Sequence, residues 1–383
     1  MVREIMSEFA RLTGLRPAGK APRRYLWTDA FAVCNFLDLY RRTGEDGWRD
    51  LARELVDQVH HVLGRHRADD PRKGWISSLD EREGQNHPAI GGLRIGKEMN
   101  ERKPGEPFDE RLEWERDGQY YHYLTKWMHA LHRMSRVTGE PVFYRWAVEL
   151  ARTTHARFTY APPSGGQRRI FWKMSIDLSR PLVPSMGQHD PLDGFVTYNQ
   201  LHAAVPENSD KQTVAYLHTE ISDLAGICEG KHWATDDPLG LGGLLTDAFK
   251  VAQLIAKFRF EGMELLKIIL EDALVGLQFY ARNNTLNASA DYRLAFRELG
   301  LSIGLHALDR LDHFSRECRD VFGAQRAVAG RVEALRDYAP VGESVERFWL
   351  KGENRGTETW KAHGDINMVM LATSLAPDGY LWI

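Results

Sequence analysis

The chain has 383 residues with a formal net charge of −3, and 43% of the residues are hydrophobic. This length suits one large domain or two ordinary ones, and the balanced charge argues against nucleic acid as a partner. Three scattered cysteines without a CxxC pair indicate thiols in a reducing compartment. The start of the chain does not read as a signal peptide, and no window of about 18 uninterrupted apolar residues indicates a membrane span. We therefore expect a cytoplasmic protein without a membrane partner.

Helical patterns dominate the sequence and come in two kinds. Residues 30–40 are apolar on nearly every side, as in a helix enclosed by its neighbours. Residues 48–63 carry apolar side chains on one stripe and charged ones opposite, as in a surface helix. An enclosed helix followed by a one-sided helix recurs along the chain, in residues 120–134 with 142–158 and in residues 294–311 with 321–335, and residues 366–372 form another enclosed run.

One predicted outer helix, residues 263–280, is more apolar than its position requires. We expect loops or another subunit to cover it, which leaves the oligomeric state open.

Two short patterns are repeated. Residues 28–31 and 246–249 both read Thr-Asp-Ala-Phe, and we expect each copy to open an enclosed helix. Residues 43–45 and 138–140 both read Thr-Gly-Glu, between an enclosed helix and a one-sided helix. Repetition of this kind indicates an array of helix pairs.

Two long segments rich in Pro and Gly interrupt the helices, at about residues 67–118 and 160–210. Loops of this length inside a domain are usually functional or disordered, and their many aromatic residues argue against disorder. The clearest strand pattern is residues 169–178.

The alternating helices predict a two-layer ring with enclosed helices inside and one-sided helices outside. We expect one domain over residues 1–383, with the two long segments as loop insertions that cap one mouth of the ring and with little β-structure.

Residues 24–29, Arg-Tyr-Leu-Trp-Thr-Asp, open an enclosed helix that is followed by the first Thr-Gly-Glu turn. This stretch resembles the six-hairpin glycosidase-like superfamily, particularly the unsaturated glucuronyl hydrolases. Together with residues 120–138, it resembles the N-acylglucosamine 2-epimerases more weakly. The resemblance implies an all-α fold, the (α/α)6 toroid. In the hydrolases an aspartate of an inner-helix Trp-x-Asp is general acid and base, and Asp29 holds the matching position. The epimerases use two histidines and an arginine.

In such a ring, the first turns of the enclosed helices meet at one mouth. The polar residues expected there are our catalytic candidates: Asp29, Asp247, Asp365, His218, Glu220 and His363. Two carboxylates facing each other across a pocket suit glycoside hydrolysis, with one as proton donor and the other activating water.

Each candidate also has a structural explanation. Asp29 and Asp247 fit helix starts, with the preceding threonine as cap. His218 and Glu220 fit a buried pair, and Asp365 fits an N-terminal cap.

The substrate-binding candidates are residues near the same expected mouth or in the long loops: Arg24, Trp27, Trp75, His122, Trp172 and His189. Their tryptophans would stack on sugar rings. The sequence has no HExxH or Cys/His metal spacing and no phosphate-binding loop followed by Lys-Ser/Thr, so we expect no metal and no cofactor.

Three functions remain open. The first is a glycoside hydrolase acting on an oligosaccharide or a sugar containing uronic acid, so that the partner is a small carbohydrate. The second is a sugar epimerase or isomerase that uses His218 or His363. The third is a ring without catalysis, which binds carbohydrate or acts as a scaffold.

Overall fold

The structure is a computed structural model that describes residues 1–19, 21–203 and 217–383. These residues are mainly helical with short strands, so the predicted all-α class with long loops and little β-structure is confirmed. They divide into two compact units, one of Met1–Phe9 with Gly230–Ile383 and one of Ala10–Glu229. Closure of the helix pairs into one ring, and a single domain over the whole chain, remain predictions.

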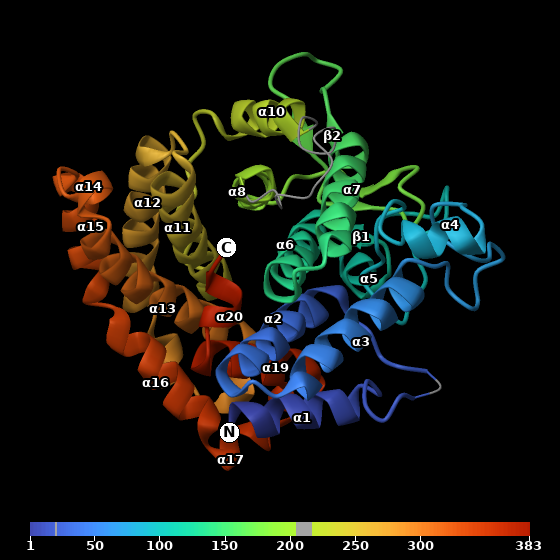
Figure 1. Cartoon of the computed structure of the whole chain (residues 1–383), viewed down its shortest axis with the longest axis horizontal. Helices are drawn as coiled ribbons and strands as arrows, with labels where there is room; N and C mark the ends of the chain where they lie inside the picture. Colours follow the sequence, from blue (N-terminus) through green and yellow to red (C-terminus); the bar gives the residue numbers. More distant parts are fainter. Residues whose placement is uncertain (20, 204–216) are drawn as a thin grey trace. The chain divides into compact units, whose positions relative to one another are not determined.

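The Ala10–Glu229 unit begins with two helix pairs that follow the predicted alternation (Figure 1). Helix α2 (Leu26–Thr43) is buried continuously from Leu26 to Leu39, whereas α3 (Asp46–Leu63) buries one stripe. Helices α6 (Tyr121–Thr138) and α7 (Pro141–Phe158) form the second pair. The repeated Thr-Gly-Glu is the turn of each pair, because Gly44 and Gly139 adopt φ of 70° and 75° and end α2 and α6.

A third pair lies where we expected a loop. Helix α8 (Asp190–Ala203) packs against α6, and α10 (His218–Cys228) packs against α8. The prediction of a loop is therefore wrong over residues 190–203. Pro191 and Gly194 favour the prediction of a loop, but proline is also common in the first turn of a helix. Gly194 is needed for packing, since a Cβ there would lie 2.1 Å from the Tyr121 hydroxyl oxygen.

The long loops contain short elements: α4 (Glu81–Asn86), α5 (Glu110–Glu115), and five strands, β1 (Gln119–Tyr120), β2 (Thr159–Tyr160), β3 (Arg169–Ile170), β4 (Lys173–Met174) and β5 (Pro181–Val183). One antiparallel sheet has the order β1-β4-β5, with Tyr120 opposite Lys173, and β2 pairs with β3. The predicted strand at 169–178 is thus two short strands in two different sheets.

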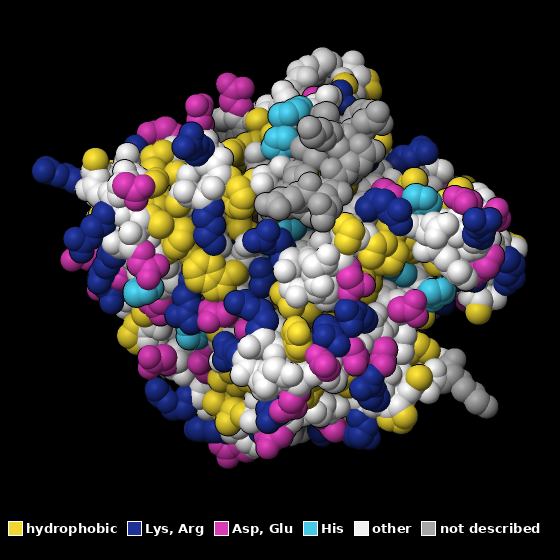
Figure 2. All heavy atoms as spheres, in the orientation of Figure 1, with side chains coloured by type: hydrophobic (Ala, Val, Ile, Leu, Met, Phe, Trp, Pro, Cys, Tyr) yellow, Lys and Arg dark blue, Asp and Glu magenta, His cyan; other side chains and the backbone are white. Residues whose placement is uncertain are grey.

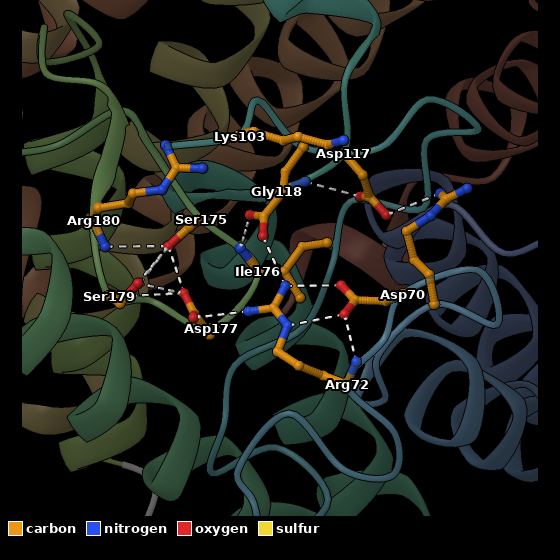
Figure 3. A network of polar contacts seen from close by, with 12 residues as sticks. Asp70, Arg72, Lys103, Asp117, Gly118, Ser175, Ile176, Asp177, Ser179 and Arg180 are labelled. Carbon is orange, nitrogen blue, oxygen red and sulfur yellow. Dashed lines mark hydrogen bonds and ion pairs between the residues drawn. The ribbon is translucent and has the colours of Figure 1, made fainter. Parts of the chain in front are cut away.

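A network of hydrogen bonds and ion pairs connects the two long loops, at about residues 67–118 and 160–189 (Figure 3). Arg72 in the first loop lies 2.8 Å from Asp70 and 2.8 Å from Asp177 of the second loop. Asp177 in turn accepts hydrogen bonds from Ser175 and Ser179. The loops are thereby held in one arrangement through many weak contacts.

The Gly230–Ile383 unit is built around the close pair α11 (Pro238–Phe258) and α13 (Ala295–Glu317). Around it lie α12 (Met263–Arg282), α15 (Arg326–Arg336), α16 (Ala339–Leu350) and α19 (Gly364–Leu375), with the short elements η2 (Asn284–Asn287), η3 (Ala290–Tyr292), α14 (Arg319–Phe322), α17 (Gly352–Arg355), α18 (Glu358–Ala362) and α20 (Asp378–Leu381). Helix α1 (Val2–Leu12) runs from this unit into the other.

Two helices of this unit differ from expectation. Helix α11 begins at Pro238, so the second Thr-Asp-Ala-Phe lies in mid-helix and not at a helix start. Helix α12 leaves Ile268 and Phe279 exposed, and what covers them remains a prediction. Among the described residues, α11 is the one helix long and apolar enough to cross a bilayer. Because 72% of its apolar window is buried inside the protein, as in a core helix, this is weak evidence for a span.

Candidate functional site

Acidic and basic side chains meet at the first turns of α6 and α8. Helix α6 is fixed at its start by the sheet, because Tyr121 N donates a hydrogen bond to Trp172 O at 3.2 Å. It contributes His122 and Lys126, and α8 contributes Asp190 and Asp193.

Each carboxylate oxygen of Asp193 accepts a hydrogen bond. Lys126 donates to one of its carboxylate oxygens and Thr125 to the other. Asp193 is buried, and the ammonium group of Lys126 compensates its charge.

Asp190 and His122 form a different kind of pair. His122 Nδ1 lies 3.7 Å from Asp190 Oδ1, which is too long for a hydrogen bond. Within the described ranges, His122 Nδ1 and Asp190 Oδ2 are both shielded from solvent and have no hydrogen-bond partner. The His122 side chain as a whole is 29% exposed. The His122 side chain thus borders the surface, and the two polar atoms of the pair are not satisfied within the described structure.

Burial shifts the pKa values of both groups. Burial, and then the charge of Asp193, raise the pKa of Asp190 to about 7, with Lys126 opposing. Burial lowers the pKa of His122 to about 4. Near pH 7 a carboxyl group that is about half protonated therefore lies beside a neutral imidazole, and such a pair can give and take protons.

Aromatic rings line the site. Trp172 lies nearly parallel to His122, with ring centroids 6.3 Å apart and an interplanar angle of 15°. Tyr120 contacts both rings, at 5.4 Å from His122 and 5.3 Å from Trp172. Tyr123 packs edge-on against His122, and its hydroxyl is 2.7 Å from that of Tyr25. We call Tyr25, Tyr120, Tyr123 and Trp172 the aromatic wall. Tyr120 is 3% exposed, so the partly exposed rings of Tyr25, Tyr123 and Trp172 are the faces available to a sugar ring.

The structure brings together two of the predicted binding residues, His122 and Trp172. His189 directly precedes Asp190 in the sequence, and its carbonyl oxygen accepts a hydrogen bond from Asp193 N. Trp27 and Trp75 are 6% and 2% exposed, so they offer little surface for stacking. Trp27 packs against Phe31, and Trp75 lies under Arg65.

Asp29 and Arg24 have structural partners. Asp29 Oδ2 accepts a hydrogen bond from Tyr25 N at 2.9 Å, which ties the side chain to the N-cap residue of α2. Its Oδ1 lies 3.5 Å from Arg24, which also donates to Thr13 O. The predicted threonine cap is wrong, because Thr28 lies within α2 and the N-cap is Tyr25. Both Asp29 and Arg24 are buried, and a catalytic role for Asp29 remains a prediction.

The other catalytic candidates are spread over both units. Asp247 is buried in the middle of α11, whereas His363 and Asp365 lie at the start of α19. His218 is exposed at the start of α10, so the buried His218–Glu220 pair that we considered does not form. Glu220 is partly buried. A common mouth for these residues remains a prediction.

Sequence reasoning placed Asp190 with His189 in the second long loop and gave it no catalytic role, and it missed Asp193 and Lys126. The available signal was the spacing of the two aspartates, three apart around Pro191, which places both carboxylates in the first turn of a helix. It was overlooked because α8 was read as loop. Among the described residues, no three His, Cys, Asp or Glu side chains are grouped as metal ligands would be.

No protein-family model and no curated protein matches the sequence. Solved structures do show a similar chain path. A sugar epimerase from a ruminal bacterium has 10% identity and a TM-score of 0.48, covering 92% of this chain and 87% of that one. Cellobiose 2-epimerase from Bacillus thermoamylovorans B4167 has 11% identity and a TM-score of 0.49, and the match covers 92% of this chain and 88% of that one. Cellobiose 2-epimerase from Spirochaeta thermophila DSM 6192 has 13% identity and a TM-score of 0.46, and the match covers 88% of this chain and 85% of that one. Identities and scores this low carry no conclusion about activity.

Proposed function

We propose that this chain is a carbohydrate-active enzyme that transfers protons at a sugar, as an epimerase or isomerase does, with His122 and Asp190 as the acid–base pair. The observation that supports this is the 3.7 Å approach of the two groups, each with an unpartnered polar atom in the described structure. Proton abstraction next to a carbonyl needs one group that accepts a proton and one that donates. Asp190, with a pKa of about 7, suits either role, and the lowered pKa of His122 keeps its imidazole neutral as an acceptor.

Hydrolysis finds less support at this site. A glycosidase needs a second carboxylate that is available to attack or to activate water. The neighbouring carboxylate here is Asp193, and both of its oxygens are occupied by Lys126 and Thr125. Asp193 therefore acts as a neighbouring charge that adds to the effect of burial in raising the pKa of Asp190. We expect no release of a second sugar.

The test is proton exchange. Reducing sugars are incubated with the protein in D2O, and NMR follows deuterium uptake at the carbon next to the carbonyl. Asp190→Asn and His122→Gln should each slow the exchange by roughly a hundredfold or more, since acid–base groups contribute about 10²–10⁴-fold. Asp57→Asn on the outer helix α3 is the control, because that side chain is 72% exposed. Unchanged exchange in both site variants would refute the assignment, and release of a second sugar would restore the hydrolase hypothesis.

A further inference from the structure

The surface beside the acid–base pair carries one large aromatic side chain that packing does not cover. Trp114, at the end of α5, is 46% exposed. Exposed aromatic rings that are rimmed by polar groups mark binding surfaces, since leaving them in water is unfavourable.

The ring is held in place. Trp114 packs edge-on against Trp172, with centroids 4.7 Å apart and an interplanar angle of 76°. Its neighbour Glu113 is buried and accepts hydrogen bonds from Arg102 Nε at 2.9 Å and from Lys173 Nζ at 3.0 Å. A ring fixed in this way loses little freedom when a ligand binds.

Trp114 continues the aromatic wall outward. Trp172 contacts Trp114 on one side and is stacked with His122 on another. His122, Trp172 and Trp114 therefore form a series of neighbouring rings that starts at the acid–base pair. A molecule that lies along it places one ring at His122 and another at Trp114.

Polar groups suited to hydroxyls stand beside this surface. Glu115 is exposed, and its carboxylate has no hydrogen bond or ion pair in the described part of the chain. Lys97 is partly buried, with its ammonium group 6.0 Å from the Tyr25 ring centroid and no ion pair to any described residue. A carboxylate and an ammonium group beside aromatic rings match the hydroxyls and the apolar face of a pyranose. They do not match the core of a protein interface, where charged residues are depleted.

We infer that Trp114, Glu115 and Lys97 form a binding subsite for a second sugar ring, so that the substrate is an oligosaccharide. This inference rests on the proposed function, because it extends the same site outward.

The test compares binding of disaccharides and monosaccharides to the full chain by calorimetry, with lactose, maltose and digalacturonate against galactose, glucose and galacturonate. Trp114→Ala should weaken disaccharide binding by about tenfold and leave monosaccharide binding unchanged. Leu112→Ala is the matched control, since Leu112 lies on the same short helix and is 42% exposed. Glu115→Gln should weaken disaccharide binding by a smaller factor.

The outcomes separate this inference from the proposed function. Disaccharide binding that depends on Trp114, together with an absence of proton exchange, would support the subsite and remove the proposed chemistry. Proton exchange on monosaccharides and disaccharides alike, unaffected by Trp114→Ala, would keep the chemistry and overturn the subsite. Failure of every disaccharide to bind, or self-association that Trp114→Ala abolishes, would also overturn the subsite.

Discussion

Gly242 on α11 lies so close to Gly300 on α13 that a Cβ added to Gly242 would be 2.0 Å from the Gly300 carbonyl oxygen. Gly304, one turn further along α13, meets Gly242 in the same way, since its Cβ would lie 2.6 Å from the Gly242 Cα. The two helices thus touch through their backbones. Gly242 is therefore part of the surface through which α11 packs on α13.

The first prediction uses this contact. Gly242→Ala should destabilise the protein by about 1–3 kcal/mol or more, because the new methyl group has no room and the backbone must move. Gly243→Ala, at the next position, has nothing within 4 Å of its added Cβ. It should stabilise the protein by up to about 1 kcal/mol through helix propensity. Urea unfolding measures both, and equal effects of the two substitutions would contradict the backbone contact.

The second prediction concerns the base of the aromatic wall. Lys173 is fully buried, and its ammonium group contacts Glu113 and lies 5.3 Å from the Tyr120 ring centroid. Lys173→Met should cost about 3–5 kcal/mol, because it leaves a buried carboxylate with fewer partners. Lys73→Met, at an exposed lysine, should change stability by less than about 0.5 kcal/mol. Thermal unfolding of both variants decides the point, and a mild effect at Lys173 would show that Arg102 alone satisfies Glu113.

The third prediction separates function from stability at Asp190. Its folded-state pKa of about 7 lies above the usual aspartate value, so the folded state binds the proton more tightly than the unfolded state. Stability is therefore lost as the pH rises from about 4 to 7. Asp190→Asn should remove this loss, raising stability at pH 8 by a few kcal/mol while it abolishes proton exchange.

Denaturation at pH 4 and pH 8 measures this effect, with a gain expected at pH 8 and little at pH 4. A variant that is less stable at pH 8 would give Asp190 a structural role in place of a catalytic one. In the unmodified protein, exchange that depends on protonated Asp190 should decline as the pH passes about 7.

The fourth prediction concerns His60 in the core of the Ala10–Glu229 unit. Burial lowers its pKa to about 3, and its Nε2 accepts a hydrogen bond from the Trp127 indole at 3.2 Å. In the unfolded chain His60 is protonated below about pH 6.5, whereas in the folded chain it stays neutral down to about pH 3. Stability should therefore fall between pH 6.5 and 3, by about 1.4 kcal/mol per pH unit from this group.

His60→Gln offers an acceptor to the indole without a titrating group, and it should flatten this part of the pH profile. His61→Gln is the control, because the neighbouring Asp57 raises the pKa of His61, which is the opposite of the shift at His60. If the slope of His60→Gln matches that of the unmodified protein, another buried group governs acid unfolding.

The sequence alone was sufficient for the helix pairs. The enclosed and one-sided patterns of α2, α3, α6 and α7 reflect which sides of each helix are buried, and the Thr-Gly-Glu turns need glycine at positive φ. Charges of both signs are mixed over the surface seen in Figure 2, as the net charge of −3 indicated. These features depend on neighbours within a few residues, which a sequence pattern records directly.

The tertiary structure alone decided the site. His122 and Asp190 are far apart in sequence and meet because α6 and α8 pack together, which in turn requires the missing side chain of Gly194. The same packing removes Asp190 from water beside Asp193 and thereby moves its pKa to about 7. Local sequence gave Asp29 and Asp247 the same surroundings, yet one is hydrogen-bonded to the N-cap residue of α2 and the other lies within α11. A residue's chemistry depends on burial and on distant charges, and these are properties of the packed chain.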